Sequence, residues 1–352
     1  MRKTAILTIT AIALAGFLAL PVQADDTAEA GGQVVQADHY SVTVPDEIAE
    51  LSVIDVNGDA ISFSEKIAHE GNYGGFVGEI ELYSSMKDYA GMPEFERAGE
   101  ITTADGTKYD VLLQYPTDVQ FDLENEESKA NYNTISEAFR STIKDSITPI
   151  DGTFTPQDEI DTDGIYAELL EKLKADIAEQ KDAEALTADD FCYLYSYYYD
   201  GEEPAESALG YAYMDYNHDG YDELLIGDLD EPLIYDMYTQ VDGEVFHLIC
   251  AGERDVYNIV SNDGKNPGLI RETASGGAFT TLVKYYILDA AAEELGLQLT
   301  YAYDENAGPK KIYTIIYGED TEAEPITEDE WYEGVERGGA PLKIEFTAFA
   351  AE

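Results

Sequence analysis

The sequence predicts an α+β protein of two domains, and three observations lead to this prediction. Over much of the chain, apolar and polar residues alternate in short runs between turn residues, as in antiparallel strands. Around residues 130–143 and 165–200, apolar residues instead recur every three or four positions, as in amphipathic helices. A chain of 352 residues, 44% of them hydrophobic, can bury two cores. We therefore expect an N-terminal antiparallel sheet with a helix, a helical connector and a C-terminal all-β domain.

The first domain is expected over residues 38–150. The dipeptide Asn57-Gly58 lies between two apolar runs and predicts a tight hairpin. Apolar residues recur at helical spacing from Tyr132 to Ile143, which predicts one helix after the strands. Residues 151–164 are rich in Gly, Pro and acidic residues, as linkers are. The expected strands lie near 40–44, 51–56, 60–66, 75–84, 97–103 and 108–115.

The connector is expected over residues 165–200. An apolar residue recurs every four positions over 165–177, which predicts a helix that is capped near residues 162–163. A second helix is expected to begin at Thr187, with Asp190 as its capping-box partner, and to end at Gly201.

The C-terminal domain is expected over residues 205–352. Short apolar runs at a spacing of about 10 residues predict a meander, a sandwich or part of a propeller. No repeat of about 40 residues is present, so a complete propeller is not expected. Thr327 and Glu330 form a capping-box pattern that predicts a short helix. The expected strands lie near 210–215, 223–228, 233–240, 245–250, 256–261, 268–273, 281–288, 297–303 and 311–317.

The most specific motif runs from Asp215 to Glu223 and has the pattern Asp-x-Asn-x-Asp-Gly-x-x-Glu. Calcium prefers six to eight oxygen ligands, and Gly220 at position six allows the sharp turn that a calcium loop needs. A helix-flanked EF-hand would need an acid at position twelve, where this chain has Ile226. Strand-like runs flank the motif instead. We therefore expect a calcium loop in a hairpin.

With its last acid at position nine and an apolar strand directly after it, this loop resembles the calcium loop of FG-GAP/VCBS-type repeats. The resemblance covers about twenty residues, in a single copy, with Glu where these repeats usually have Asp and without their upstream Phe-Gly segment. It implies a structural calcium ion held by the Tyr221 carbonyl and four side chains: Asp215, Asn217, Asp219 and Glu223.

The layout as a whole also resembles a group of uncharacterised secreted proteins of Gram-positive gut bacteria, which implies a location and an architecture rather than an activity. Besides the loop, the segments that carry this resemblance are Tyr115-Pro-Thr-Asp118, Val119-Gln120-Phe121-Asp122, Ile234-Tyr-Asp236, Gly252-Glu-Arg254 and Gly276-Gly277-Ala278.

The N-terminus and the charge indicate where the protein acts. Residues 1–24 combine a basic start, an apolar run and a Val22-Gln23-Ala24 cleavage pattern, which predicts a secretory signal peptide; a retained anchor is the alternative. A disordered acidic and Gly-rich stretch is expected over 25–37. No later segment could span a membrane. We expect a secreted, extracellular or cell-surface protein.

A net charge of −53 repels phosphate backbones, so a nucleic-acid partner is not expected. Solubility or a saline habitat would explain the same charge. Cys192 and Cys250 are a candidate disulfide in an exported chain, and two buried free thiols are the alternative.

Catalytic patterns are weak. The four histidines, His39, His69, His218 and His247, lack metal-ligand spacing. His247 and Cys250 are three residues apart, which in a regular strand places them on opposite faces and disfavours a dyad. We therefore expect noncatalytic recognition of an extracellular protein or glycan. One alternative is a glycan-directed hydrolase with an unrecognised carboxylate pair, and another is a structural or immune-facing surface protein.

Overall fold

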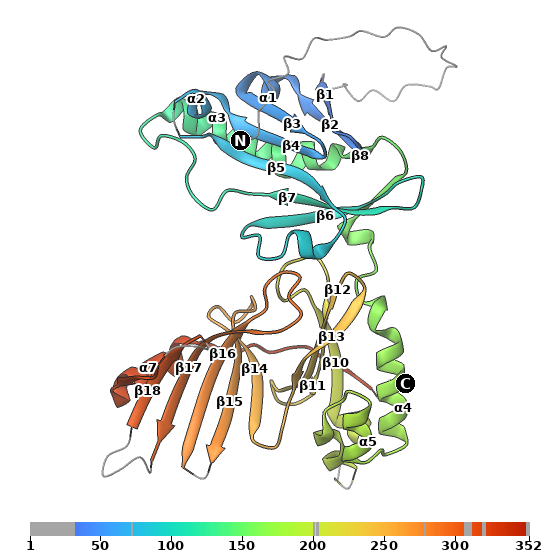
Figure 1. Ribbon diagram of the computed structural model, residues 1–352, viewed down its shortest axis with the longest axis vertical. Coiled ribbons are helices and arrows are strands. Elements are labelled where there is room, and N and C mark those ends of the chain that lie inside the picture. The colour runs from blue at the N-terminus through green and yellow to red at the C-terminus, as the bar shows by residue number, and fades with distance from the viewer. Residues whose placement is uncertain are drawn as a thin grey trace.

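The computed structural model describes residues 32–71, 73–199, 201, 204–277, 279–305, 312–318 and 322–349. The predicted signal peptide, residues 1–24, and residues 25–31 of the acidic stretch lie outside this range. Figure 1 shows a smaller N-terminal body, in blue to green, and a larger C-terminal body that is rich in strands. The α+β class is confirmed.

The N-terminal domain packs α3 (Glu126–Ala138) against a six-stranded antiparallel sheet, with a three-stranded sheet beside it (Figure 1). Phe63, Ile80 and Phe139 are fully buried in the core between these layers. In sheet order, the larger sheet is β3 (Ser52–Asn57), β4 (Ala60–Glu65), β5 (Phe76–Tyr83), β7 (Lys108–Gln114), β6 (Phe95–Thr102) and β9 (Thr153–Pro156). The smaller is β1 (Gly32–Gln36), β2 (Tyr40–Pro45) and β8 (Thr148–Pro149). The short helices are α1 (Asp46–Leu51), α2 (Lys66–Glu70), η1 (Met86–Asp88), η2 (Phe139–Ile143) and η3 (Lys144–Ser146).

The predicted hairpin is present, because Asn57 pairs with Ala60 and Gly58 turns the chain with φ of +65°. Two segments differ from the prediction. Gly32–Gln36, which lie in the stretch expected to be disordered, form β1 and bury Val35 against the core. Thr153–Pro156, which lie in the expected linker, form β9 at the edge of the larger sheet. Both strands are short, and their partners are distant in sequence or lie across a turn.

The connector consists of short helices, the longest being α4 (Ala167–Ala178). The predicted cap at Thr187 is wrong. Asp182 caps α5 (Ala183–Ala188) by accepting the Ala185 amide at 2.9 Å, and Thr187 lies inside the helix, where its hydroxyl donates to the Ala183 carbonyl. Asp163 makes no side-chain cap. The other short helices here are η4 (Gln157–Glu159), η5 (Gly164–Tyr166), η6 (Tyr193–Tyr198) and α6 (Ala205–Ala208).

The C-terminal domain is a twelve-stranded antiparallel sheet in which most neighbours follow in sequence, as the meander prediction requires. The sheet forks at β12, which pairs with β13 over most of its length and with β14 only at Ile234. The predicted Thr327–Glu330 capping box is present at α7 (Glu328–Arg337). The strands are β10 (Leu209–Met214), β11 (Glu223–Asp228), β12 (Ile234–Val241), β13 (Glu244–Cys250), β14 (Asp255–Ser261), β15 (Ile270–Gly277), β16 (Thr280–Ile287), β17 (Gly296–Asp304), β18 (Ile312–Tyr317), β19 (Glu324–Ile326), β20 (Ala340–Pro341) and β21 (Thr347–Ala348).

Candidate functional site

The acidic loop, residues 215–223, connects β10 to β11, and its ends are joined by the pair Met214 and Glu223. His218 and Gly220 have φ of +58° and +86°, the left-handed region that makes the turn sharp. His218 is exposed at a position where a calcium loop has no ligand. The structure therefore places the motif where the sequence predicted it, in a tight hairpin.

Short polar contacts fold the side chains of the acidic loop back onto its own backbone. Asp215 Oδ2 accepts the Gly220 amide at 3.1 Å, and Asn217 Oδ1 accepts the Asp219 amide at 3.2 Å. Asp219 Oδ1 accepts the Tyr221 amide at 3.0 Å. Such contacts are typical of Asp and Asn in turns. They hold three of the predicted ligand side chains on the inside of the turn.

Burial sets the loop's carboxyl groups apart from ordinary surface acids. Asp219 and Glu223 are each 1% exposed, and Asp215 Oδ1 is buried without a hydrogen-bond partner. Burial raises the pKa of Asp219 to about 6, and burial together with the charge of Asp219 raises that of Glu223 well above its usual range. No ion pair to any of the three is present among the residues that the structure describes. A cation at this point would relieve both the burial cost and the mutual repulsion.

The donor set fits calcium. It consists of hard oxygens, and a buried carboxylate oxygen of Asp215 is still free to bind an ion. Glu223 is already positioned, because the Tyr216 amide and the Thr239 hydroxyl donate to its two oxygens at 2.8 and 2.9 Å. Calcium–oxygen bonds are about 2.3–2.6 Å long. The sequence-predicted ligands are therefore together in one loop, and the resident ion remains a prediction.

The acidic loop also touches the N-terminal domain. Arg97 on β6, Asp110 on β7 and Tyr221 in the loop form what we call the Arg97 network. The Arg97 guanidinium donates to Asp110 Oδ1 at 2.6 Å and to the Tyr221 hydroxyl at 2.7 Å, and it lies 4.2 Å from the centre of the Tyr221 ring. The Gln157 side-chain amide donates to the Gly220 carbonyl. A Cβ on Gly220 would lie 2.9 Å from Arg97 side-chain atoms.

Apolar packing accompanies these polar contacts. Met86, Tyr89 and Leu112 of the first domain form one buried cluster with Val241 and Ala291 of the second. A backbone contact also crosses the junction, because the Met86 amide donates to Asp242 Oδ1 at 2.7 Å. The acidic loop thus lies at the junction of the two domains, a position that its sequence did not reveal.

Sequence reasoning missed a second group, which we call the thiol cluster: Asp236, His247 and Cys250. One ligand atom from each lies within 4.8 Å of the other two, and among the described residues this is the one such group of three His, Cys, Asp or Glu side chains. The loop carboxylates do not meet that criterion, so calcium binding would draw them closer together.

The thiol cluster exists because β13 is irregular. Asp236 pairs with Cys250 and Tyr238 with His247, and the register shifts between them, which leaves Leu248 without a partner. This bulge puts His247 and Cys250 on one face, so the prediction of opposite faces is wrong. Burial lowers the pKa of His247, but the hydrogen bond to Asp236 and the charge of that carboxylate outweigh it and raise the pKa overall.

The two cysteines are free thiols, so the candidate disulfide is not formed. Cys192 is buried, as the alternative prediction required, and donates to the Ala251 carbonyl at 3.1 Å, whereas Cys250 is exposed. No helix in the described part of the chain is long and apolar enough to cross a membrane.

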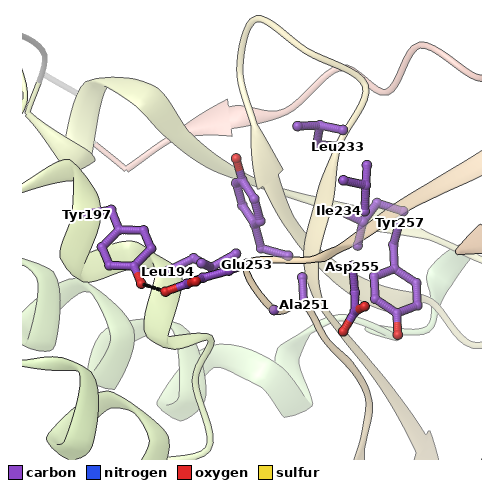
Figure 2. A pocket seen from close by; sticks show the side chains of 11 residues that line it. Leu194, Tyr197, Leu233, Ile234, Ala251, Glu253, Asp255 and Tyr257 are labelled. Atoms are coloured by element: carbon purple, nitrogen blue, oxygen red, sulfur yellow. Dashed lines mark hydrogen bonds between the residues drawn. The ribbon is translucent and has the colours of Figure 1, made fainter. Parts of the chain in front are cut away.

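A cavity of about 250 Å³ lies between η6 and the strands β12 and β14 (Figure 2). Its walls include the rings of Tyr197, Tyr235 and Tyr257 and the carboxyl groups of Glu253 and Asp255. Figure 2 shows the Tyr197 hydroxyl directed at Glu253, to which it donates a hydrogen bond.

Comparisons with known proteins do not assign this chain to a family. No family model, curated protein or solved structure matches it.

Proposed function

We propose that this chain is a secreted, noncatalytic recognition protein in which the acidic loop binds a structural calcium ion that fixes the two domains against each other. One observation carries the proposal: the carboxylates of Asp219 and Glu223 and one oxygen of Asp215 are buried at the junction of the domains, and none of them has a cationic partner among the described residues. Buried charges persist where a partner or a metal compensates them.

The contrast with Asp110 supports this role for the ion. Asp110 is also buried, but Arg97, Tyr89 and Tyr221 donate to it, so its charge is neutralised within the protein. The loop carboxylates accept hydrogen bonds from backbone amides, and within the described residues no such cation pairs with them. Calcium would supply that charge from solution, and the loop it orders presents Tyr221 to the first domain.

The cavity in Figure 2 is the surface that we propose for recognition. Its tyrosine rings offer apolar faces on which a sugar ring or a peptide side chain can stack, and Glu253 and Asp255 can accept hydrogen bonds from hydroxyl or amide groups. The Tyr193 hydroxyl holds the Glu253 amide at 2.8 Å, which fixes that wall. A glycan or an extracellular protein segment is the partner class that this chemistry supports.

Thermal unfolding with calcium and with a chelator tests the role of the ion. Calcium should raise the melting temperature. At a hundredfold excess of calcium over Kd, the free energy of unfolding should rise by about 2.7 kcal/mol. Asp215→Ala and Asp219→Ala should abolish the response, while Asp263→Ala should keep it, because Asp263 is an exposed turn aspartate. Magnesium should stabilise less, since it demands octahedral geometry. Equal melting curves in calcium and chelator would refute the calcium site.

A glycan and protein binding array tests the recognition role separately. Tyr197→Ala should lose binding that Asp215→Ala retains at low temperature, because no loop residue lines the cavity. Turnover of a bound glycan would instead favour the hydrolase alternative, and loss of binding in a folded Asp215→Ala variant would place the ion at the partner surface.

A further inference from the structure

We propose that the thiol cluster is a second metal site, which takes zinc or a similar borderline divalent ion. It is separate from the calcium loop and independent of the proposed function. The cluster offers one carboxylate oxygen, one imidazole nitrogen and one sulfur, all within 4.8 Å of one another. Zinc bonds of about 2.0–2.3 Å in a tetrahedral site place ligand atoms roughly 3.3–3.8 Å apart, so the group is already close to the size required.

The ligand types decide the class of metal. Calcium and magnesium take oxygen ligands, and sulfur is a poor ligand for them. A mixture of thiolate, imidazole and carboxylate is typical of zinc and its neighbours in the first transition series. The thiol cluster and the acidic loop should therefore bind different ions with little competition.

The surroundings hold two of the ligands in place. Asp236 is fully buried; one of its oxygens receives the Cys192 amide at 2.9 Å and the Tyr195 hydroxyl, and the other lies 2.8 Å from His247 Nε2. The Tyr238 ring stacks on the imidazole, with 4.4 Å between centroids and 13° between planes. Such outer contacts orient metal ligands and raise metal affinity.

Access to the site is open. His247 and Cys250 are exposed, whereas Asp236 forms the floor. All three residues come from two paired strands, which makes the spacing rigid. Three protein ligands leave a fourth position, which water, a ligand atom from outside or the neighbouring Cys192 thiol can fill.

Cobalt is the probe of choice, because it replaces zinc and reports thiolate ligation by a charge-transfer band in the near ultraviolet. The full chain, kept with a non-thiol reductant, should show this band on adding one equivalent of cobalt, and zinc should abolish it. Cys250→Ser should remove the band and weaken zinc binding at least tenfold. His247→Gln should weaken zinc binding to a similar extent while keeping a weaker thiolate band.

The matched control is His39→Gln. His39 Nδ1 lies 2.8 Å from Asp59 Oδ2, a pair with the same spacing as His247 and Asp236, and no cysteine is part of it. This variant should keep both the band and the zinc affinity. Absence of the band at saturating cobalt, or a band that survives Cys250→Ser, would overturn the proposal, and so would equal weakening by His39→Gln.

Discussion

The acidic loop and the thiol cluster are both candidate metal sites, but the chain builds them in opposite ways. The loop offers ligands from nine consecutive residues, 215–223, all of them oxygen, and it contacts the first domain through Tyr221. The thiol cluster joins two strands through an irregular register and mixes oxygen, nitrogen and sulfur. A contiguous site is visible in a sequence, whereas a site made by register is not.

The two sites also differ in how the protein without metal tolerates them. In the acidic loop, burial and repulsion among carboxylates oppose folding until a cation arrives. In the thiol cluster, Asp236 already has donors on both oxygens, so the protein without metal is satisfied. We therefore expect calcium to stabilise the fold strongly and zinc to be bound by a site that is preorganised.

The largest effect is expected for Arg97→Met, which tests whether the loop depends on the first domain. The change leaves Asp110 buried without its cation, and breaking a buried pair costs about 3–5 kcal/mol. Urea unfolding in excess calcium should show this loss, and zinc binding should be unchanged. Arg140→Met is the matched control, because Arg140 is exposed over the Tyr115 ring, and about 1 kcal/mol or less is expected.

A loss of zinc affinity in Arg97→Met would contradict the separation of the two sites. An effect no larger than that of Arg140→Met would show that water reaches Asp110 and that the Arg97 network does not couple the domains.

The second prediction concerns pH without calcium. The pKa of Asp219 is about 6 in the folded chain, above its ordinary value of 3.8. The stability that protonation of Asp219 contributes is therefore fully present below about pH 4 and is lost as the pH rises through 6. Over this pH range the free energy of unfolding should fall by roughly 2–3 kcal/mol through Asp219 alone. Acidification also relaxes the general negative charge, so the measurement is the difference in pH slope between the wild type and Asp219→Asn.

In chelator, the wild type should lose more stability than Asp219→Asn between pH 4 and 7. In saturating calcium the wild type should instead lose less stability than Asp219→Asn over this pH range, because the ion requires the ionised carboxylate. If the wild type and Asp219→Asn have the same pH slope in chelator, the Asp219 carboxylate is not buried in the folded protein.

Much of the fold could be predicted from local sequence. The hairpin at Asn57-Gly58 and the capping box at Thr327 depend on a few adjacent residues, and both are present. The helix start at Thr187 was wrong because Asp182, five residues earlier, is an equally good cap and is the one used. β9 was missed because its pairing with β6 depends on tertiary contacts.

The sites show the same division. The five predicted calcium ligands lie in one loop because they are close in sequence, although their carboxylate oxygens are less closely gathered than the ligand atoms of the thiol cluster. Strict alternation along a regular strand would put His247 and Cys250 on opposite faces. The unpaired Leu248 reverses that relation, and a bulge is set by pairing with β12 rather than by the residues of β13.

The third prediction sharpens the account of the thiol cluster. Asp236 Oδ2 accepts hydrogen bonds from the Cys192 amide and the Tyr195 hydroxyl. Tyr195→Phe removes the second of these donors and keeps the ring in the core. Zinc affinity should fall about tenfold, the lower end of the effect of losing an outer contact. The calcium response should not change. Equal zinc affinity in Tyr195→Phe and the wild type would show that Asp236 needs no orientation or is not a ligand.

The smallest effect is expected for Thr239→Val, and it tests the one strand that serves both sites. β12 carries Asp236 in the thiol cluster and, three residues later, Thr239, whose hydroxyl donates to Glu223 Oε1 at 2.9 Å. Valine keeps the shape and removes the donor, which should cost about 1 kcal/mol in chelator. In calcium the cost should shrink if the ion binds this oxygen directly, because the metal then replaces the lost hydrogen bond. Cobalt absorption should stay as in the wild type, since Thr239 does not touch the thiol cluster. A parallel loss of cobalt binding would show instead that β12 transmits strain between the sites, and the two would then have to be treated as one coupled unit.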